Sequence, residues 1–366
     1  MIWIDSVKLL LVHHFSLTNI TGVTVMVSEL LRRIPAVDPG VEVSYLSFDD
    51  FANPGSLEEF LEHRHSDAAC VIGANLHIEV RWDLSQALAR WCACHSIPLY
   101  DNVHDYWPHH RDNLAQLVGR WKVSLAGASP YIIESLAAAG CESRCLPMGV
   151  QLPGGLASPR PSPKVIASVG RLIRRKRFPD VARAFCSAGL DKSEKLCLTL
   201  LRSQVFGAEQ DYAQLSAIRN EIERPGVKRD AIELSFVPTV PPDYSSYSVY
   251  VCASDYEGFS MPPYEAAYCG CPPILSDIPP HRWMAGALFG ERASDFLFPA
   301  GATEVLADLL SDEIATGRRQ DWILADHARI RSTIESRFSL QTTARAFAQL
   351  CREAASFPGT TGSRPA

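Results

Sequence analysis

The sequence predicts an α/β protein with two doubly wound, Rossmann-like domains, each built on a parallel sheet. Three observations predict this class. Apolar runs of strand length alternate with helical repeats along the chain. The runs are apolar at successive positions, as in strands that helices cover on both faces. At 366 residues, 47% of them hydrophobic, the chain is long for one core and suits two.

Charge and composition argue against several classes of protein. A net charge of −6 disfavours nucleic acid or an anionic membrane as the main partner, because both need a broad basic face. No apolar run approaches the ~18 residues of a membrane span. Asp5 stands where a signal peptide needs basic residues. We therefore expect a cytoplasmic protein, and leave open a peripheral contact with the inner face of a membrane.

The eleven cysteines are expected to be reduced and mostly buried, because no secretory signal accompanies them. Two groups invite comparison with metal sites, Cys92-Ala93-Cys94-His95 and Cys269-Gly270-Cys271. Neither has the two-residue spacing or the second pair of a zinc site. We therefore expect no metal site, and interpret these cysteines as small core residues.

The first half begins with a buried strand, Val7 to His13, followed by a polar loop and a helical repeat. The helix is expected from Gly22 to Ile34, where Pro35 would stop it. Gly22 is a candidate binding residue, because doubly wound folds bind ligands outside the carboxyl ends of strands. A glycine that serves packing alone is the alternative. Further strands are expected at 42–46, 69–73, 98–102 and 123–126, and a capping box at Ser56-Leu57-Glu58-Glu59.

A polar and aromatic stretch, residues 101–110, directly follows one of these strands. His104 is its candidate functional residue, because polar side chains at strand ends are often functional. The alternative is a histidine that Asp105 holds for loop structure. His109 and His110 are expected to face solvent.

The second half follows a linker rich in Pro, Gly and Ser at 151–163. A strand at 164–169 leads into a basic loop that contains Arg171 and Lys176. Such a strand-to-helix loop is where a doubly wound sheet binds phosphate. An ordinary solvated charge cluster is the alternative, and it stays open for Arg174, Arg175 and Arg177.

Residues 248–283 hold the strongest signal. A buried strand at 249–253 is followed by a loop from Glu257 to Met261 and a helix expected from Pro263 to Cys269. The first N–H groups of a helix have no partner in the chain and attract phosphate. Glu257 and Glu265 flank that position, and carboxylates accept two hydrogen bonds from a vicinal diol. This stretch therefore predicts a binding site for a phosphate group with a sugar on each side of it.

This stretch resembles the retaining glycosyltransferases of family four, which have the GT-B fold. Their signature is two glutamates separated by seven residues within a longer run. Trp283 departs from it, where the family commonly has an acidic residue. Met148 also departs, at a position often held by asparagine. The matching positions are Glu257, Gly258, Phe259, Pro262, Glu265, Ala266, Gly270, Pro272, Ile274, Ser276, Asp277, Ile278, Pro279, His281 and Arg282.

The resemblance implies a domain organisation. Residues 1–155 would form the acceptor domain, to which part of the last helix, 340–356, returns. Residues 156–338 would bind the nucleotide sugar in a cleft facing the first domain, and 357–366 would be a disordered tail. The backbone of 237–242 would lie at the edge of the nucleobase.

The resemblance also implies roles for individual residues. The enzyme would move a hexose from a nucleoside-diphosphate sugar to an acceptor hydroxyl with retention of configuration. His104 and Glu257 would orient the hexose, and Glu265 would hold the ribose. No Asp-x-Asp triplet occurs, so catalysis is expected to need no metal and no cofactor. The donor diphosphate would be bound by Arg171, Lys176 and the amides of Gly258, Phe259, Ser260 and Met261, with Gly22 near the donor or the acceptor.

Three alternatives stay open: a nucleotide-sugar epimerase or sugar phosphorylase of the same fold, a hydrolase using Glu257 and Glu265 as an acid/base pair, and a non-catalytic nucleotide-sugar-binding partner. The hydrolase is disfavoured, because Glu265 at a helix N-terminus suits a diol holder better. The acceptor is undetermined: a glycan, a lipid-linked glycan and a small molecule are all compatible with the sequence.

Overall fold

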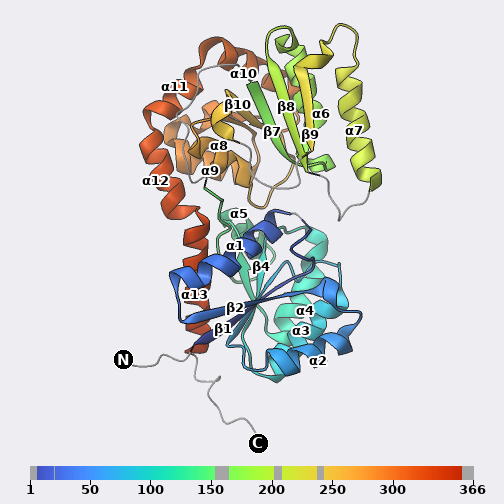
Figure 1. Ribbon diagram of the computed structural model, residues 1–366, viewed down its shortest axis with the longest axis vertical. Coiled ribbons are helices and arrows are strands. Elements are labelled where there is room, and N and C mark those ends of the chain that lie inside the picture. Colours follow the sequence, from blue (N-terminus) through green and yellow to red (C-terminus); the bar gives the residue numbers. More distant parts are fainter. Residues whose placement is uncertain (1–5, 20, 153–164, 202–207, 237–242, 357–366) are drawn as a thin grey trace, which may run out of the picture. The chain divides into compact units, whose positions relative to one another are not determined.

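The computed structural model describes residues 6–19, 21–152, 165–201, 208–236 and 243–356. The chain forms two compact units (Figure 1). Unit 1 comprises Met1–Gly149 and Leu340–Ala366, and unit 2 comprises Val150–Ser339. The chain first changes unit after Gly149 rather than at the predicted residue 155. The tail predicted to be disordered, 357–366, lies outside the described residues, as do most of the predicted linker and the segment 237–242.

Unit 1 is built on a six-stranded sheet with strand order β2-β1-β3-β4-β5-β6. All its neighbouring strands are parallel, so their carboxyl ends lie along one edge. The strand β6 was not predicted, because its three residues are largely exposed and form no apolar run. The strands are β1 (Val7–His13), β2 (Val41–Ser47), β3 (Cys70–Ala74), β4 (Leu99–Val103), β5 (Ser124–Gly127) and β6 (Ser143–Cys145).

The helices of unit 1 correct two expectations. Pro35 lies inside α1 rather than ending it; near the C-terminus of a helix, a missing N–H costs a single hydrogen bond. Ser56 is not the N-cap of α2, because Asn53 caps the helix and Ser56 closes the capping box. The helices are α1 (Gly22–Val37), α2 (Pro54–Arg64), α3 (Trp82–Cys94), α4 (Arg111–Trp121), α5 (Pro130–Ala138) and α13 (Leu340–Ala355).

The last helix, α13, belongs to unit 1. It packs beside α1 and against β1 and β3 (Figure 1). Arg352 donates from Nε and Nη2 to the carboxylate of Asp38, each at 2.5 Å. Because Asp38 is the C-cap of α1, this ion pair joins two helices that are far apart in sequence.

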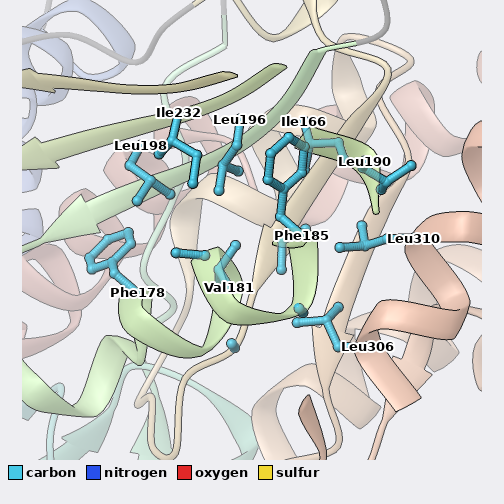
Figure 2. Packing of buried hydrophobic residues seen from close by; sticks show 14 of the residues in the cluster. Ile166, Phe178, Val181, Phe185, Leu190, Leu196, Leu198, Ile232, Leu306 and Leu310 are labelled. Atoms are coloured by element: carbon cyan, nitrogen blue, oxygen red, sulfur yellow. The ribbon is translucent and has the colours of Figure 1, made fainter. Parts of the chain in front are cut away.

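Unit 2 is built on a second six-stranded parallel sheet, with order β12-β11-β10-β7-β8-β9. One face of the sheet packs against α6 through Phe178, Val181 and Phe185, which meet Leu198 and Ile232 of the strands (Figure 2). The strands β11 and β12 were not predicted. The strands are β7 (Val165–Arg171), β8 (Lys195–Leu201), β9 (Ile232–Phe236), β10 (Val249–Cys252), β11 (Pro273–Ser276) and β12 (Leu297–Phe298).

The helices α11 and α12 of unit 2 are separate, with Asp326 between them. No helix among the described residues combines the length and apolar character that a bilayer crossing requires. The helices are α6 (Phe178–Ser187), α7 (Ala208–Ile222), α8 (Met261–Tyr268), α9 (Pro279–Phe289), α10 (Thr303–Thr316), α11 (Arg318–Ala325) and α12 (His327–Arg337).

Candidate functional site

The candidate site of unit 2 lies where the strand order reverses. The chain runs from β7 outward through β8 to β9, and then starts again at β10 on the other side of β7. The strands β7 and β10 are hydrogen-bonded neighbours, with Val249 opposite Ile166. A crevice outside the carboxyl ends of two such strands is the usual ligand position in a doubly wound sheet. Here those ends are followed by the basic loop of Lys176 and by the loop of Glu257.

Lys176 ends the short 3-10 turn Arg174–Lys176 and reaches toward the loop after β10. A Cβ atom added to Gly170 would lie 3.3 Å from Cε of Lys176, so the glycine leaves room for the lysine stem. The ammonium group donates to Oε1 of Glu257 at 2.5 Å. The two loops are also joined by their backbones, because the N–H of Asp255 donates to the carbonyl of Arg175 at 2.8 Å.

Glu257 is buried and ionised. Burial alone would raise its pKa, but the charges of Lys176 and Arg175 and hydrogen bonds from Lys176 and Ser254 lower the pKa to about 2. Ser254 donates from Oγ to Oε1 at 2.7 Å, and its own carbonyl accepts from Ser276 at 2.6 Å. The carboxylate is therefore fixed in place, and an incoming sugar hydroxyl would meet a charged acceptor.

Glu265 lies in α8 and is also buried, but in the opposite charge state. Burial raises its pKa to about 8, and the hydrogen bond that Oε2 accepts from Tyr244 at 3.3 Å only partly offsets this. Tyr244 was not predicted, because it belongs to no sequence motif. At neutral pH the Glu265 carboxyl therefore carries a proton, which a diol ligand would have to displace.

The N-terminus of α8 begins at Met261, two residues before the expected Pro263. Ser260 is its N-cap, and its side chain accepts no capping hydrogen bond. Because Pro262 and Pro263 have no N–H, the backbone donors here come from Met261 and the loop before it. Phe259 stacks on Tyr264 with ring centroids 4.9 Å apart and planes 6° apart, which orders that loop.

The other basic residues of the loop divide by their contacts. Arg171 is the last residue of β7 and is half-buried. Arg177 forms ion pairs with Asp180 and, at 3.4 Å, with Asp255. Arg175 lies over the ring of Tyr256, 5.6 Å from its centroid. Arg174 is exposed. Arg175 and Arg177 thus contact side chains of the neighbouring loops, and Arg171 and Lys176 lie at the end of β7 and beside Glu257.

In unit 1, His104 follows β4 and is buried, with 4% of its surface exposed. Its backbone N–H donates to Oδ1 of Asn75 at 2.7 Å. Neither ring nitrogen has a hydrogen-bond partner among the described residues, so Asp105 does not lock the ring there. Burial lowers its pKa to about 4. A neutral, buried imidazole with unpaired nitrogens is costly unless a polar ligand or water completes it.

Two further residues near His104, Asp101 and His77, were not predicted to be functional. Asp101 is buried and accepts from Nδ1 of His77 at 2.7 Å and from the N–H of Leu76 at 2.8 Å. Asp101 begins the polar stretch 101–110, so its position was visible in the sequence, but its partner His77 was not. His110 is buried, which corrects the expectation that it faces solvent; His109 is exposed.

Gly22 is the first residue of α1 and is exposed. Thr21 caps the helix, and its Oγ1 accepts from the N–H of Thr24 at 3.1 Å. One N-terminal donor of α1 is therefore satisfied within the chain, and Gly22 leaves the backbone accessible from solvent.

One family model matches part of the chain. The family described as glycosyl transferases group 1 matches residues 157–323, which lie in unit 2. Unit 2 is therefore similar to glycosyl transferases group 1 over these residues. Arg171, Lys176, Glu257 and Glu265 all lie inside the matched residues. No curated protein sequence matches the chain.

Solved structures show the fold of the whole chain. Sucrose-phosphate synthase (tll1590) from Thermosynechococcus elongatus is 15% identical, with 95% of this chain and 98% of that chain covered and a TM-score of 0.69. Alr3699/HepE of Anabaena, in complex with UDP-glucose, is 13% identical, with 94% and 99% covered and a TM-score of 0.68. The lipopolysaccharide outer core galactosyltransferase WaaB is 14% identical, with 94% and 99% covered and a TM-score of 0.61. The predicted GT-B class is thereby confirmed.

Proposed function

We propose that the protein transfers a hexose from a nucleoside-diphosphate sugar to an acceptor hydroxyl, with retention of anomeric configuration and without a metal. The observation that carries the proposal is the buried pair of Lys176 and Glu257 at the point where the strand order of unit 2 reverses. This pair places a cation for phosphate next to a carboxylate for sugar hydroxyls, and the family match of the domain supports that use.

The donor diphosphate binds Arg171, Lys176 and the amides of Gly258, Phe259, Ser260 and Met261. Charge grows on the leaving diphosphate as the anomeric bond breaks, and fixed donors stabilise it more than mobile water does. Because this positive charge comes from side chains and amides, the reaction needs no bound cation to supply it. A guanidinium adds bidentate contacts that a point charge cannot make.

The ribose and the hexose of the donor lie on either side of the diphosphate. Glu265, with Tyr244 beside it, accepts from the ribose hydroxyls, and Glu257 accepts from the hexose. The Anabaena structures hold UDP-glucose, and UDP with glucose, which supports a nucleotide-sugar donor here.

His104 keeps its predicted role of contacting a sugar hydroxyl, and its two unpaired ring nitrogens support this role.

The acceptor is a glycan, a lipid-linked glycan or a small molecule. We place the reaction in the cytoplasm, with peripheral contact at a membrane left open, and the eleven unpaired cysteines agree with a reducing compartment.

A screen of nucleotide sugars tests the proposal. The full chain should show a higher Tm with one nucleoside diphosphate and its sugar than with the others, because ligands that bind the native state stabilise it. Product formation with the best donor should then require an acceptor, persist in EDTA, and give a retained anomeric configuration by NMR. Conversion of the donor without acceptor would favour an epimerase. Tight binding with no turnover on any acceptor would favour a non-catalytic partner.

A further inference from the structure

A cluster of metal-ligand side chains lies in unit 1, apart from the residues used above. Glu79 follows β3, and His109 and His110 belong to the 3-10 turn Pro108–His110 after β4. One donor atom of each residue lies within 4.8 Å of the others. Because β3 and β4 are adjacent parallel strands, both loops leave the same edge of the sheet.

These distances suit a shared cation. Two donors bound to one ion at about 2.1 Å are separated by roughly 3.4 Å in a tetrahedral site and at most about 4.2 Å in any geometry. Glu79 and His109 are exposed, so small side-chain rotations can bring their donors within that range. The rings of His109 and His110 already lie with centroids 4.2 Å apart.

The third ligand adds a separate observation. His110 is 6% exposed, and its Nδ1 is buried with no hydrogen-bond partner in the described part of the chain. The neighbouring His77, 5.1 Å away between ring centroids, uses both of its nitrogens, on Asp101 and on the carbonyl of Asp105. His77 therefore holds the turn in place without being a ligand, and His110 is left with unused ligand capacity.

We propose that Glu79, His109 and His110 form a binding site for a divalent transition metal of the zinc class. Two imidazoles and one carboxylate are the donors that Zn²⁺, Co²⁺ and Ni²⁺ prefer over Mg²⁺ or Ca²⁺. Three protein ligands leave at least one position for water. The ion would join the loop after β3 to the loop after β4, which also carries His104. It is separate from the donor-binding residues of unit 2, and it does not depend on glycosyl transfer.

Titration of Co²⁺ and Zn²⁺ into the reduced full-length protein, with any purification tag removed, tests the site. We expect one equivalent to bind, with a Co²⁺ spectrum of nitrogen and oxygen ligands and no thiolate charge-transfer band. Zn²⁺ should raise the Tm in a concentration-dependent way. A thiolate band, or no binding of one equivalent, would overturn the proposal, because the exposed Cys94 and Cys145 would then be the ligands or no site would exist.

Matched variants locate the ion. Glu79→Gln and His109→Ala change exposed residues, so both should fold, and each should weaken Co²⁺ binding by at least about tenfold. His95→Ala is the control, because His95 is a surface histidine whose Nε2 lies 3.0 Å from Glu62 outside this cluster. The affinity of His95→Ala for Co²⁺ should equal that of the unaltered protein. Equal affinity in all three variants, or a loss only in His95→Ala, would refute the assignment.

Discussion

Lys176 and Glu257 form a buried pair in which each charge depends on the other. Their side chains are 12% and 5% exposed, and the atoms Nζ and Oε1 are 2.5 Å apart. Removing one partner of a buried pair leaves the other charge without compensation. The pair was visible in the sequence only as two motif residues 81 positions apart; their direct contact needed the fold, because spacing says nothing about which strands become neighbours.

Lys176→Ala should lower kcat by roughly ten- to 150-fold, from the loss of a charge-assisted contact of ~1.5–3 kcal/mol to the leaving diphosphate. Steady-state release of the nucleoside diphosphate, with the best acceptor present, measures this. Arg174→Ala is the matched control, because Arg174 is exposed in the same turn, and its kcat should stay within twofold or so of the unaltered protein. Unchanged turnover in Lys176→Ala would remove Lys176 from the mechanism.

Glu265 gives a prediction about pH. Its folded pKa of about 8 lies above the ordinary value of 4.5, so the native state binds this proton more tightly than the unfolded state. Stability from Glu265 is then complete below pH 4.5 and is lost as pH rises toward 8. Relative to Glu265→Gln, the free energy of unfolding of the unaltered protein should fall by about 3 kcal/mol between pH 4.5 and pH 7.

Urea unfolding of both proteins across that range measures the difference. If the difference in the free energy of unfolding between the two proteins stays constant with pH, Glu265 is ionised in the folded protein. Binding of the nucleoside diphosphate should also release a proton near pH 7 if the ribose hydroxyls donate hydrogen bonds to the ionised carboxylate of Glu265. Calorimetry in buffers of different ionisation enthalpy detects that proton.

At the scale of elements, apolar runs predicted most of the strands, including the edge strand β2, but missed β6, β11 and β12. The strand β1 was predicted with its observed bounds, because it contains the buried apolar run of residues 9–12. The short, exposed β6 left no such signal. Helix boundaries failed where local chemistry was misjudged: Pro35 is tolerated in the last turn of α1, and Asn53 rather than Ser56 caps α2.

The docking of α13 supports a second kind of test. Phe347 lies on the buried face of this helix, with 2% of its surface exposed. Phe347→Ala should lower the free energy of unfolding of unit 1 by roughly 3–5 kcal/mol, because a large buried ring leaves a cavity. Arg345→Ala, on the exposed face of the same helix, should change it by less than about 0.5 kcal/mol. Hydrogen exchange of α13 and of β1 compares the two variants, and equal protection in both would contradict the packing role.

At the scale of the whole molecule, the sequence predicted the class and the motif-bearing loops, but few of the contacts that complete the site. The second glutamate was predicted as a diol holder, yet its burial beside Tyr244 came only from the fold. The unpaired ring of His104 was equally invisible. Such contacts join residues far apart in sequence and follow no periodicity, so no local pattern predicts them.

The eleven cysteines give a prediction for the entire chain. All are unpaired, and only Cys94 and Cys145 are exposed. A thiol reagent should therefore modify these two first in the native protein, and all eleven after denaturation without reductant. Cys94→Ser should remove one fast-reacting thiol and leave the slower ones unchanged. Fewer than eleven reactive thiols after denaturation would reveal a disulfide.

The return of α13 to unit 1 bears on how the protein is made. Residues 1–149 leave the ribosome first, but the helix that covers α1, β1 and β3 begins at Leu340. Unit 2 is continuous, so it can finish folding while unit 1 still waits for its last segment. During that interval an apolar surface of the nascent first unit stays uncovered and open to chaperones. A stalled or prematurely terminated chain would thus yield a folded unit 2 attached to an unfinished unit 1.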